Sequence, residues 1–129
     1  MTTVDLLVQG EIATLTLNNP EKLNAINLSM WQQLADNMAK LSADPGIRCV
    51  VIRGAGEAAF AAGGDLEEFV TDRATLEQAL HYHGQVAAAL NAIADCRHPT
   101  VALIRGACIG GGLEIAGVCD LRIAGESAR

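Results

Sequence analysis

Three consecutive glycines, Gly110, Gly111 and Gly112, stand two residues before a single carboxylate, Glu114, in a stretch with a helix-like apolar pattern. Because glycine has no Cβ, its backbone N–H can come close to a ligand, and a helix starting here would direct its positive dipole end at negative charge. A carboxylate at this place could move protons beside that charge. The stretch predicts an anion-binding site next to a general acid or base. It also fits a tight turn in which Glu114 is only a solvated residue of the first helical turn.

A second glycine loop supports the first interpretation. The loop at residues 60–66 follows the strand-like run 49–53, and Asp65 near its end could cap a helix that starts at Glu67. The glycine triplet likewise follows an apolar run, residues 100–104. Two such loops after two strands provide what a two-donor oxyanion hole requires, namely one N–H from each loop directed at the same oxygen.

Alternating strands and helices must position these loops. Alternating apolar residues near the N-terminus predict a hairpin, and an apolar stripe that includes Trp31 predicts a helix with Ser29 as its N-cap. The expected elements are strands at 4–8, 12–17, 47–53, 100–104 and 120–124, and helices from Ser29 to before Pro45 and over 76–94. Strands that alternate with helices are typical of βαβ units, so the sequence predicts an α/β fold.

Three segments in this order, residues 18–26, 60–66 and 99–120, resemble the successive signatures of the crotonase superfamily, the enoyl-CoA hydratase/isomerase family. The resemblance implies an α/β spiral of β-β-α units. It also implies that Gly64 and Gly111 are the two oxyanion-hole donors, and that Glu114 is the first of the two glutamates that hydratases use. Five further residues resemble segments that embrace coenzyme A: Lys22, Leu23, Ala25, Ala61 and Ala62.

The activity implied by this resemblance is that of an enoyl-CoA hydratase, a lyase of fatty acid metabolism that adds water across the α,β double bond of an acyl-CoA thioester. Coenzyme A enters as part of the substrate, so no separate cofactor is expected, and the family forms homo-oligomers, either trimers or hexamers. Other members of the superfamily use the same hole for double-bond isomerisation, dehydration, thioester hydrolysis, dehalogenation or decarboxylation. The chain could also be a non-catalytic half that binds a partner chain, or a silent paralogue whose glycine loops are only structural.

The length adds a further expectation, because members of the superfamily are considerably longer than 129 residues. Residues 1–129 are expected to be the N-terminal part of a single core domain, with the second glutamate beyond Arg129. Such a part should be inactive alone and should expose apolar faces on its strands. The runs concerned are 50–52, 101–104 and 121–123.

Composition excludes several classes of function. A net charge of −6 and an aromatic content of 3% argue against nucleic-acid binding, which needs a basic surface and aromatic rings. No apolar run reaches the roughly 18 residues of a membrane span, and no signal peptide is visible, so a cytoplasmic protein is expected. The four cysteines form no Cys-x-x-Cys pair, which favours free thiols and no metal site. Lys22 and Arg53 are the cations expected to offset the phosphates of coenzyme A.

Overall fold

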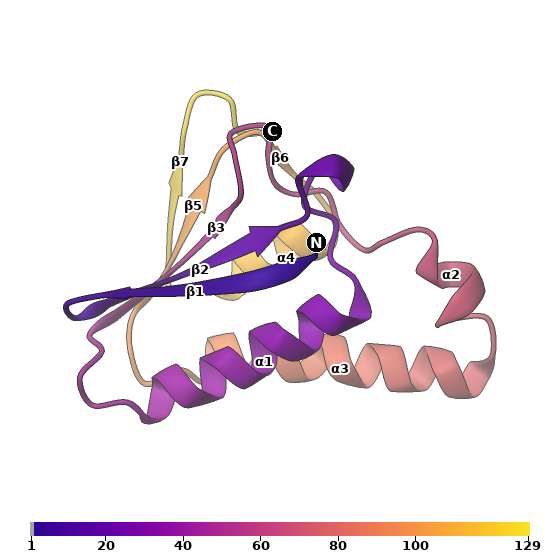
Figure 1. The fold of residues 1–129 in the computed structure, drawn as a ribbon, viewed down its shortest axis with the longest axis horizontal. Coiled ribbons are helices and arrows are strands. Elements are labelled where there is room, and N and C mark those ends of the chain that lie inside the picture. Colours follow the sequence, from indigo (N-terminus) through magenta and orange to yellow (C-terminus); the bar gives the residue numbers. More distant parts are fainter. Residues whose placement is uncertain (1) are drawn as a thin grey trace.

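A five-stranded sheet forms the framework of the computed structural model, which describes residues 2–129 (Figure 1). The strand order is β1-β2-β3-β5-β7; β1 and β2 are antiparallel, and every other neighbouring pair is parallel. The strands are β1 (Thr3–Gln9), β2 (Ile12–Asn18), β3 (Cys49–Gly54), β5 (Thr100–Ile104) and β7 (Leu121–Ala124). The tight turn between β1 and β2 contains Gly10, whose φ of 63° is a conformation that glycine adopts without steric cost. The predicted hairpin is therefore confirmed.

A smaller sheet and four α-helices complete the architecture. Strands β4 (Ala59–Ala61) and β6 (Ala107–Cys108) pair in parallel. The helices are α1 (Leu28–Ala43), α2 (Glu68–Thr71), α3 (Leu76–Ala94) and α4 (Gly111–Val118), with a short 3-10 helix η1 at Pro20–Lys22. Along the chain, the pattern of two strands followed by a helix occurs three times. Strands β3, β5 and β7 extend the large sheet, and β4 and β6 form the small one. This arrangement confirms the predicted spiral of β-β-α units.

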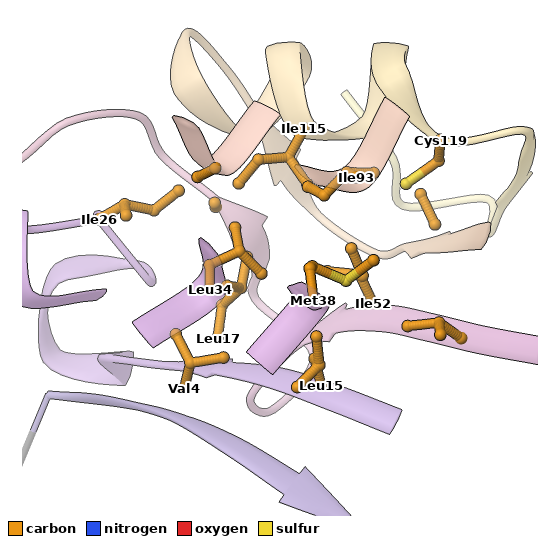
Figure 2. Packing of buried hydrophobic residues seen from close by; sticks show 14 of the residues in the cluster. Val4, Leu15, Leu17, Ile26, Leu34, Met38, Ile52, Ile93, Ile115 and Cys119 are labelled. Atoms are coloured by element: carbon orange, nitrogen blue, oxygen red, sulfur yellow. The ribbon is translucent and has the colours of Figure 1, made fainter. Parts of the chain in front are cut away.

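The core lies between the large sheet and the helices (Figure 2). Leu15 and Leu17 of β2, Leu34 and Met38 of α1, and Ile52 of β3 are all fully buried there. The alternation of β2 and the stripe of α1 thus meet on facing surfaces, as their periods of two and about 3.6 residues require. Helix α3 packs beside α1 (Figure 1), so the two helices cover one face of the sheet together.

Helix starts differ in part from the sequence prediction. Ser29 is not the N-cap of α1: the side chain of Asn27 accepts a hydrogen bond from Met30 N at 2.8 Å, and the helix begins at Leu28. Both residue types cap well, and the extended backbone of Asn27 places its side chain correctly. Asp65 does accept from Glu67 N at 3.0 Å, but this closes a turn, and α2 begins only at Glu68. The long helix α3 has the predicted bounds.

The predicted exposure of three apolar strand segments is right for β7 and largely wrong for the others. Leu121 and Ile123 of β7 are 59% and 60% exposed, because this strand is the edge of the sheet. Val50 and Ile52 of β3 are completely buried, since β3 lies between β2 and β5 under the helices. In β5 only Leu103 is exposed. No helix within residues 2–129 combines the length and the apolar character needed to cross a bilayer.

Candidate active site

The two predicted glycine loops meet in the structure. Gly63 has a φ of 104° and precedes Gly64; Gly110 has a φ of 55° and precedes Gly111 at the start of α4. A Cβ on Gly110 would lie 3.6 Å from the Cα of Gly63, and a Cβ on Gly63 would lie 3.4 Å from the carbonyl oxygen of Ile109, so the two loops are in van der Waals contact. The positive φ angles favour glycine at these two positions. The sequence pattern therefore reflects a contact between two loops that are far apart in the chain.

Each loop presents a backbone donor without a partner. Within residues 2–129, neither Gly64 N–H nor Gly111 N–H donates a hydrogen bond to a protein group. The backbone groups of the residues on either side of Gly64 are hydrogen-bonded: Ile26 N donates to Gly63 O at 2.7 Å, and Asp65 N donates to Ile26 O at 3.2 Å. Gly111 N–H is free because it belongs to the first turn of α4, where no preceding helical carbonyl is available. Unpaired donors next to each other can accommodate an anionic oxygen.

Both glycines line one cavity of about 240 Å³ together with Glu114. Glu114 lies in the first turn of α4, where its N–H donates to Gly110 O at 2.9 Å, and its side chain is exposed. The structure thus brings together all three residues that the sequence predicted as catalytic. The rest of the cavity lining was not predicted as part of a site: Trp31, Arg73, Tyr82, His83 and Val86.

A hydrogen bond between the buried Tyr82 and the partly buried Glu68 fixes one wall of this cavity. The Tyr82 hydroxyl of α3 donates to Glu68 of α2 at 2.7 Å, and the same carboxylate accepts from Leu28 N, at the start of α1, at 2.9 and 3.1 Å. Burial raises the pKa of Glu68, although both hydrogen bonds act to lower it. Burial, followed by the hydrogen bond to Glu68, raises the pKa of Tyr82 above its usual range. Glu68 therefore connects three helices, and no local sequence signal indicates this role.

The indole of Trp31 packs against Gly111. A Cβ on Gly111 would lie 2.9 Å from Cζ2 and 3.3 Å from Cη2 of the Trp31 indole, which is 2% exposed. The sequence predicts Trp31 as a core residue of α1, which is correct. Its contact with Gly111 joins residues 80 positions apart in the chain, so only the tertiary structure reveals it.

A second cavity, of about 270 Å³, contains three of the predicted coenzyme A residues: Lys22, Ala25 and Ala62. Gly64 lines both cavities, so they adjoin at the proposed oxyanion donor. Lys22 Nζ forms ion pairs with Asp65 at 3.2 Å and Glu67 at 3.0 Å, and the hydrogen bonds to Glu67 and then Asp65 raise its pKa.

The other two predicted coenzyme A residues do not line this cavity. Leu23 follows Lys22 in the chain, is 45% exposed and has a φ of 52°. Ala61 is completely buried in β4, and its carbonyl accepts from Ile109 N at 3.1 Å. Its position against α4 keeps Ala61 away from the surface available to a ligand.

Potential metal ligands are dispersed. Across residues 2–129, no three His, Cys, Asp or Glu side chains are grouped so that they could hold a metal ion. The thiols of Cys49, Cys96, Cys108 and Cys119 are free, and burial raises the pKa of Cys119 to about 11. A thiol with such a pKa is a poor nucleophile at neutral pH.

Comparison with known proteins gives one family. The model of the enoyl-CoA hydratase/isomerase family matches residues 8–129. YngF of Bacillus subtilis (strain 168), whose name refers to the same family, is 38% identical over 118 residues, 91% of this chain and 44% of YngF. The (E)-benzylidenesuccinyl-CoA hydratase of Thauera aromatica is 35% identical over 126 residues, 98% of this chain and 48% of the relative.

Solved structures give the same family. An enoyl-CoA hydratase/carnithine racemase of Magnetospirillum magneticum superimposes with a TM-score of 0.95 at 47% identity, over 99% of this chain and 48% of that one. The chain thus spans about half the length of the relatives that it matches. Sequence and fold agree, and the chain belongs to the enoyl-CoA hydratase/isomerase family of the crotonase superfamily.

Proposed function

We propose that the full-length protein containing this chain hydrates the α,β double bond of an acyl-CoA thioester, with Gly64 and Gly111 as its oxyanion donors. The observation that carries the proposal is the presence of two unpaired backbone N–H groups and the Glu114 carboxylate around one cavity. Named hydratases among the relatives support the same reaction. The reaction class is that of a lyase in acyl-CoA metabolism, and it uses no cofactor besides the coenzyme A of the substrate.

In the proposed mechanism, the thioester carbonyl oxygen accepts hydrogen bonds from Gly64 N and Gly111 N. Addition of water at Cβ moves negative charge onto this oxygen, and each donor of such a pair contributes about 3–4 kcal/mol to the stability of the transition state. Glu114 accepts the proton of the attacking water, and a second acid delivers a proton to Cα. The Lys22 cavity holds the pantetheine arm, because it reaches the thioester site at Gly64.

A paired substitution tests the role of Glu114. In the full-length protein, Glu114→Gln should reduce the turnover of crotonyl-CoA by about 10²–10⁴, the usual range for a positioned acid or base. Calorimetry should show a much smaller change in affinity. Glu126→Gln is the matched control, since it makes the same chemical change at an exposed residue that lines neither cavity. Loss of the enoyl-thioester absorbance gives the rate.

Three outcomes would count against the proposal in different ways. Unchanged hydration by Glu114→Gln would leave Glu114 as a helix-start residue only. Absence of binding at millimolar concentration, both by crotonyl-CoA and by longer or carboxylate-bearing enoyl-CoA thioesters, would remove acyl-CoA as the ligand class. Formation of a shifted double bond or of free coenzyme A, in place of the 3-hydroxyacyl product, would assign the site to isomerisation or to thioester hydrolysis.

A further inference from the structure

Arg73 is a cation in the cavity wall that forms no ion pair within residues 2–129. It follows α2, is partly buried, and lines the same cavity as Gly64 and Gly111. Its guanidinium carbon lies 4.4 Å from the ring centroid of Phe69 and 4.7 Å from that of Tyr82. Throughout the described chain, no carboxylate oxygen lies within 4.0 Å of this guanidinium, and it donates no hydrogen bond.

The aromatic rings explain how the guanidinium is held but not what it binds. Contacts with ring faces orient the planar group and leave the N–H groups at its edge available. Glu68, which binds the Tyr82 hydroxyl, also accepts a hydrogen bond from Leu28 N and forms no ion pair with Arg73. Arg73 remains charged at every physiological pH, and its partly exposed donors are available to water or to an anionic group of a ligand.

The position of Arg73 relative to the thioester site indicates which part of a substrate it would contact. Gly64 lines both the Arg73 cavity and the adjoining cavity of Lys22, Ala25 and Ala62. If the pantetheine arm occupies the Lys22 side, as in the proposed function on which this step depends, then the acyl chain enters the Arg73 side. Most of the residues on that side carry a polar or charged group: Arg73, Tyr82, His83, Glu114 and Trp31. A plain alkyl chain offers the Arg73 donors no acceptor, whereas a chain that carries an anionic group does.

We infer that the acyl group of the substrate carries a carboxylate at its far end, and that this carboxylate binds the guanidinium of Arg73. The planar fork of arginine matches the two oxygens of a carboxylate and can form two parallel hydrogen bonds with it. A site that presents such donors discriminates against an analogue that lacks the acceptor, because its own polar groups are then left unpaired.

Matched pairs of substrates test the inference on the full-length protein. Glutaconyl-CoA has a carboxylate in place of the terminal methyl of pent-2-enoyl-CoA, and 2-hexenedioyl-CoA relates in the same way to hex-2-enoyl-CoA. For at least one pair, kcat/KM and calorimetric affinity should both favour the carboxylate form by about tenfold or more. Arg73→Gln should abolish this preference, mainly through KM, and Arg73→Lys should retain part of it because the charge stays while the fork is lost. Arg97→Gln, which removes the same charge outside both cavities, should leave the preference unchanged.

The outcomes separate this inference from the proposed function. Hydration of both members of each pair with equal efficiency would overturn the carboxylate inference and leave the hydratase proposal intact. A preference for the carboxylate substrates that survives Arg73→Gln would also overturn the carboxylate inference. An equal effect of Arg73→Gln on neutral and acidic substrates would overturn it too, and would indicate that Arg73 acts on Glu114. Selective binding that depends on Arg73, without hydration, would support the inference and refute the hydratase proposal. Absence of binding by every probe would overturn both.

Discussion

Replacement of Gly111 by alanine should impair the proposed oxyanion hole through Trp31. The added Cβ would lie 2.9 Å from Cζ2 of the indole, whereas non-bonded carbons prefer a separation of about 3.5–4.0 Å. The difference requires a movement of about 0.6–1.1 Å. Trp31 is 2% exposed and packed in the core, so the loop that carries the Gly111 N–H is the part expected to move.

The size of the effect follows from this displacement. A shift of about 1 Å in a reacting group can cost 10²-fold in rate, and loss of one oxyanion donor costs about 10²–10³ in kcat. We therefore expect kcat for an enoyl-CoA to fall by about 10²–10³ in Gly111→Ala, with KM changed less. Overpacking should also lower the free energy of unfolding by about 1–3 kcal/mol.

Two variants make this experiment specific. Gly117→Ala adds the same methyl group to α4 where no atom lies within 4 Å, so its kcat should not change. Trp31→Phe in the Gly111→Ala background removes the clashing atoms and should recover part of the activity, with a coupling energy of about 0.5–3 kcal/mol in the double-mutant cycle. Full activity of Gly111→Ala, or strictly additive effects of the two substitutions, would refute the reasoning.

Three other perturbations have defined outcomes. Asn24→Ala should reduce the free energy of unfolding in urea by at least about 3 kcal/mol, because it removes three hydrogen bonds of 2.9–3.0 Å from a 1% exposed side chain and each unsatisfied group costs about 1–3 kcal/mol. A loss below about 1 kcal/mol would contradict this. Asn24→Gly is the control that separates the side-chain effect from the effect of the positive φ of 57° at this residue. The folded-state pKa of Glu68 is raised above 4.5, so the folded form binds this proton more readily and stability falls as pH rises through that pKa. Tyr82→Phe removes a hydrogen bond that lowers the pKa, so the fall should extend to higher pH, as unfolding measured over a pH series would show; an unchanged profile would exclude the coupling. Residues 1–129 alone are expected to associate through the exposed Leu121 and Ile123 and to lack hydratase activity. Light scattering and a hydration assay test this, and a stable monomer with hydratase activity would disprove both expectations.

Local patterns predicted most of the elements of the fold. The alternation of β2 and the stripe of α1 are visible in the sequence, because the side chains on one face of a strand or helix recur at fixed spacing. Helix ends were less predictable: Asn27 and Ser29 are both good capping residues, and the backbone conformation chose Asn27. Strand exposure could not be predicted from apolar runs either, since burial depends on the place of a strand in the sheet, which made β3 central and β7 an edge.

The sequence by itself determined the chemistry that the site can offer: flexible backbone donors at Gly64 and Gly111, and a carboxylate at Glu114. The glycine loops and the following carboxylate are short, contiguous motifs, and the resemblance to the crotonase superfamily singled out Gly64, Gly111 and Glu114 within them. Only the tertiary structure decided that the two loops touch, that Trp31 packs against one of them, and that Arg73 lines the same cavity with no ion pair to any described residue. Each of these contacts is between segments that are distant in the sequence. Such contacts depend on how sheets and helices pack, and the local spacing of residues does not predict that packing.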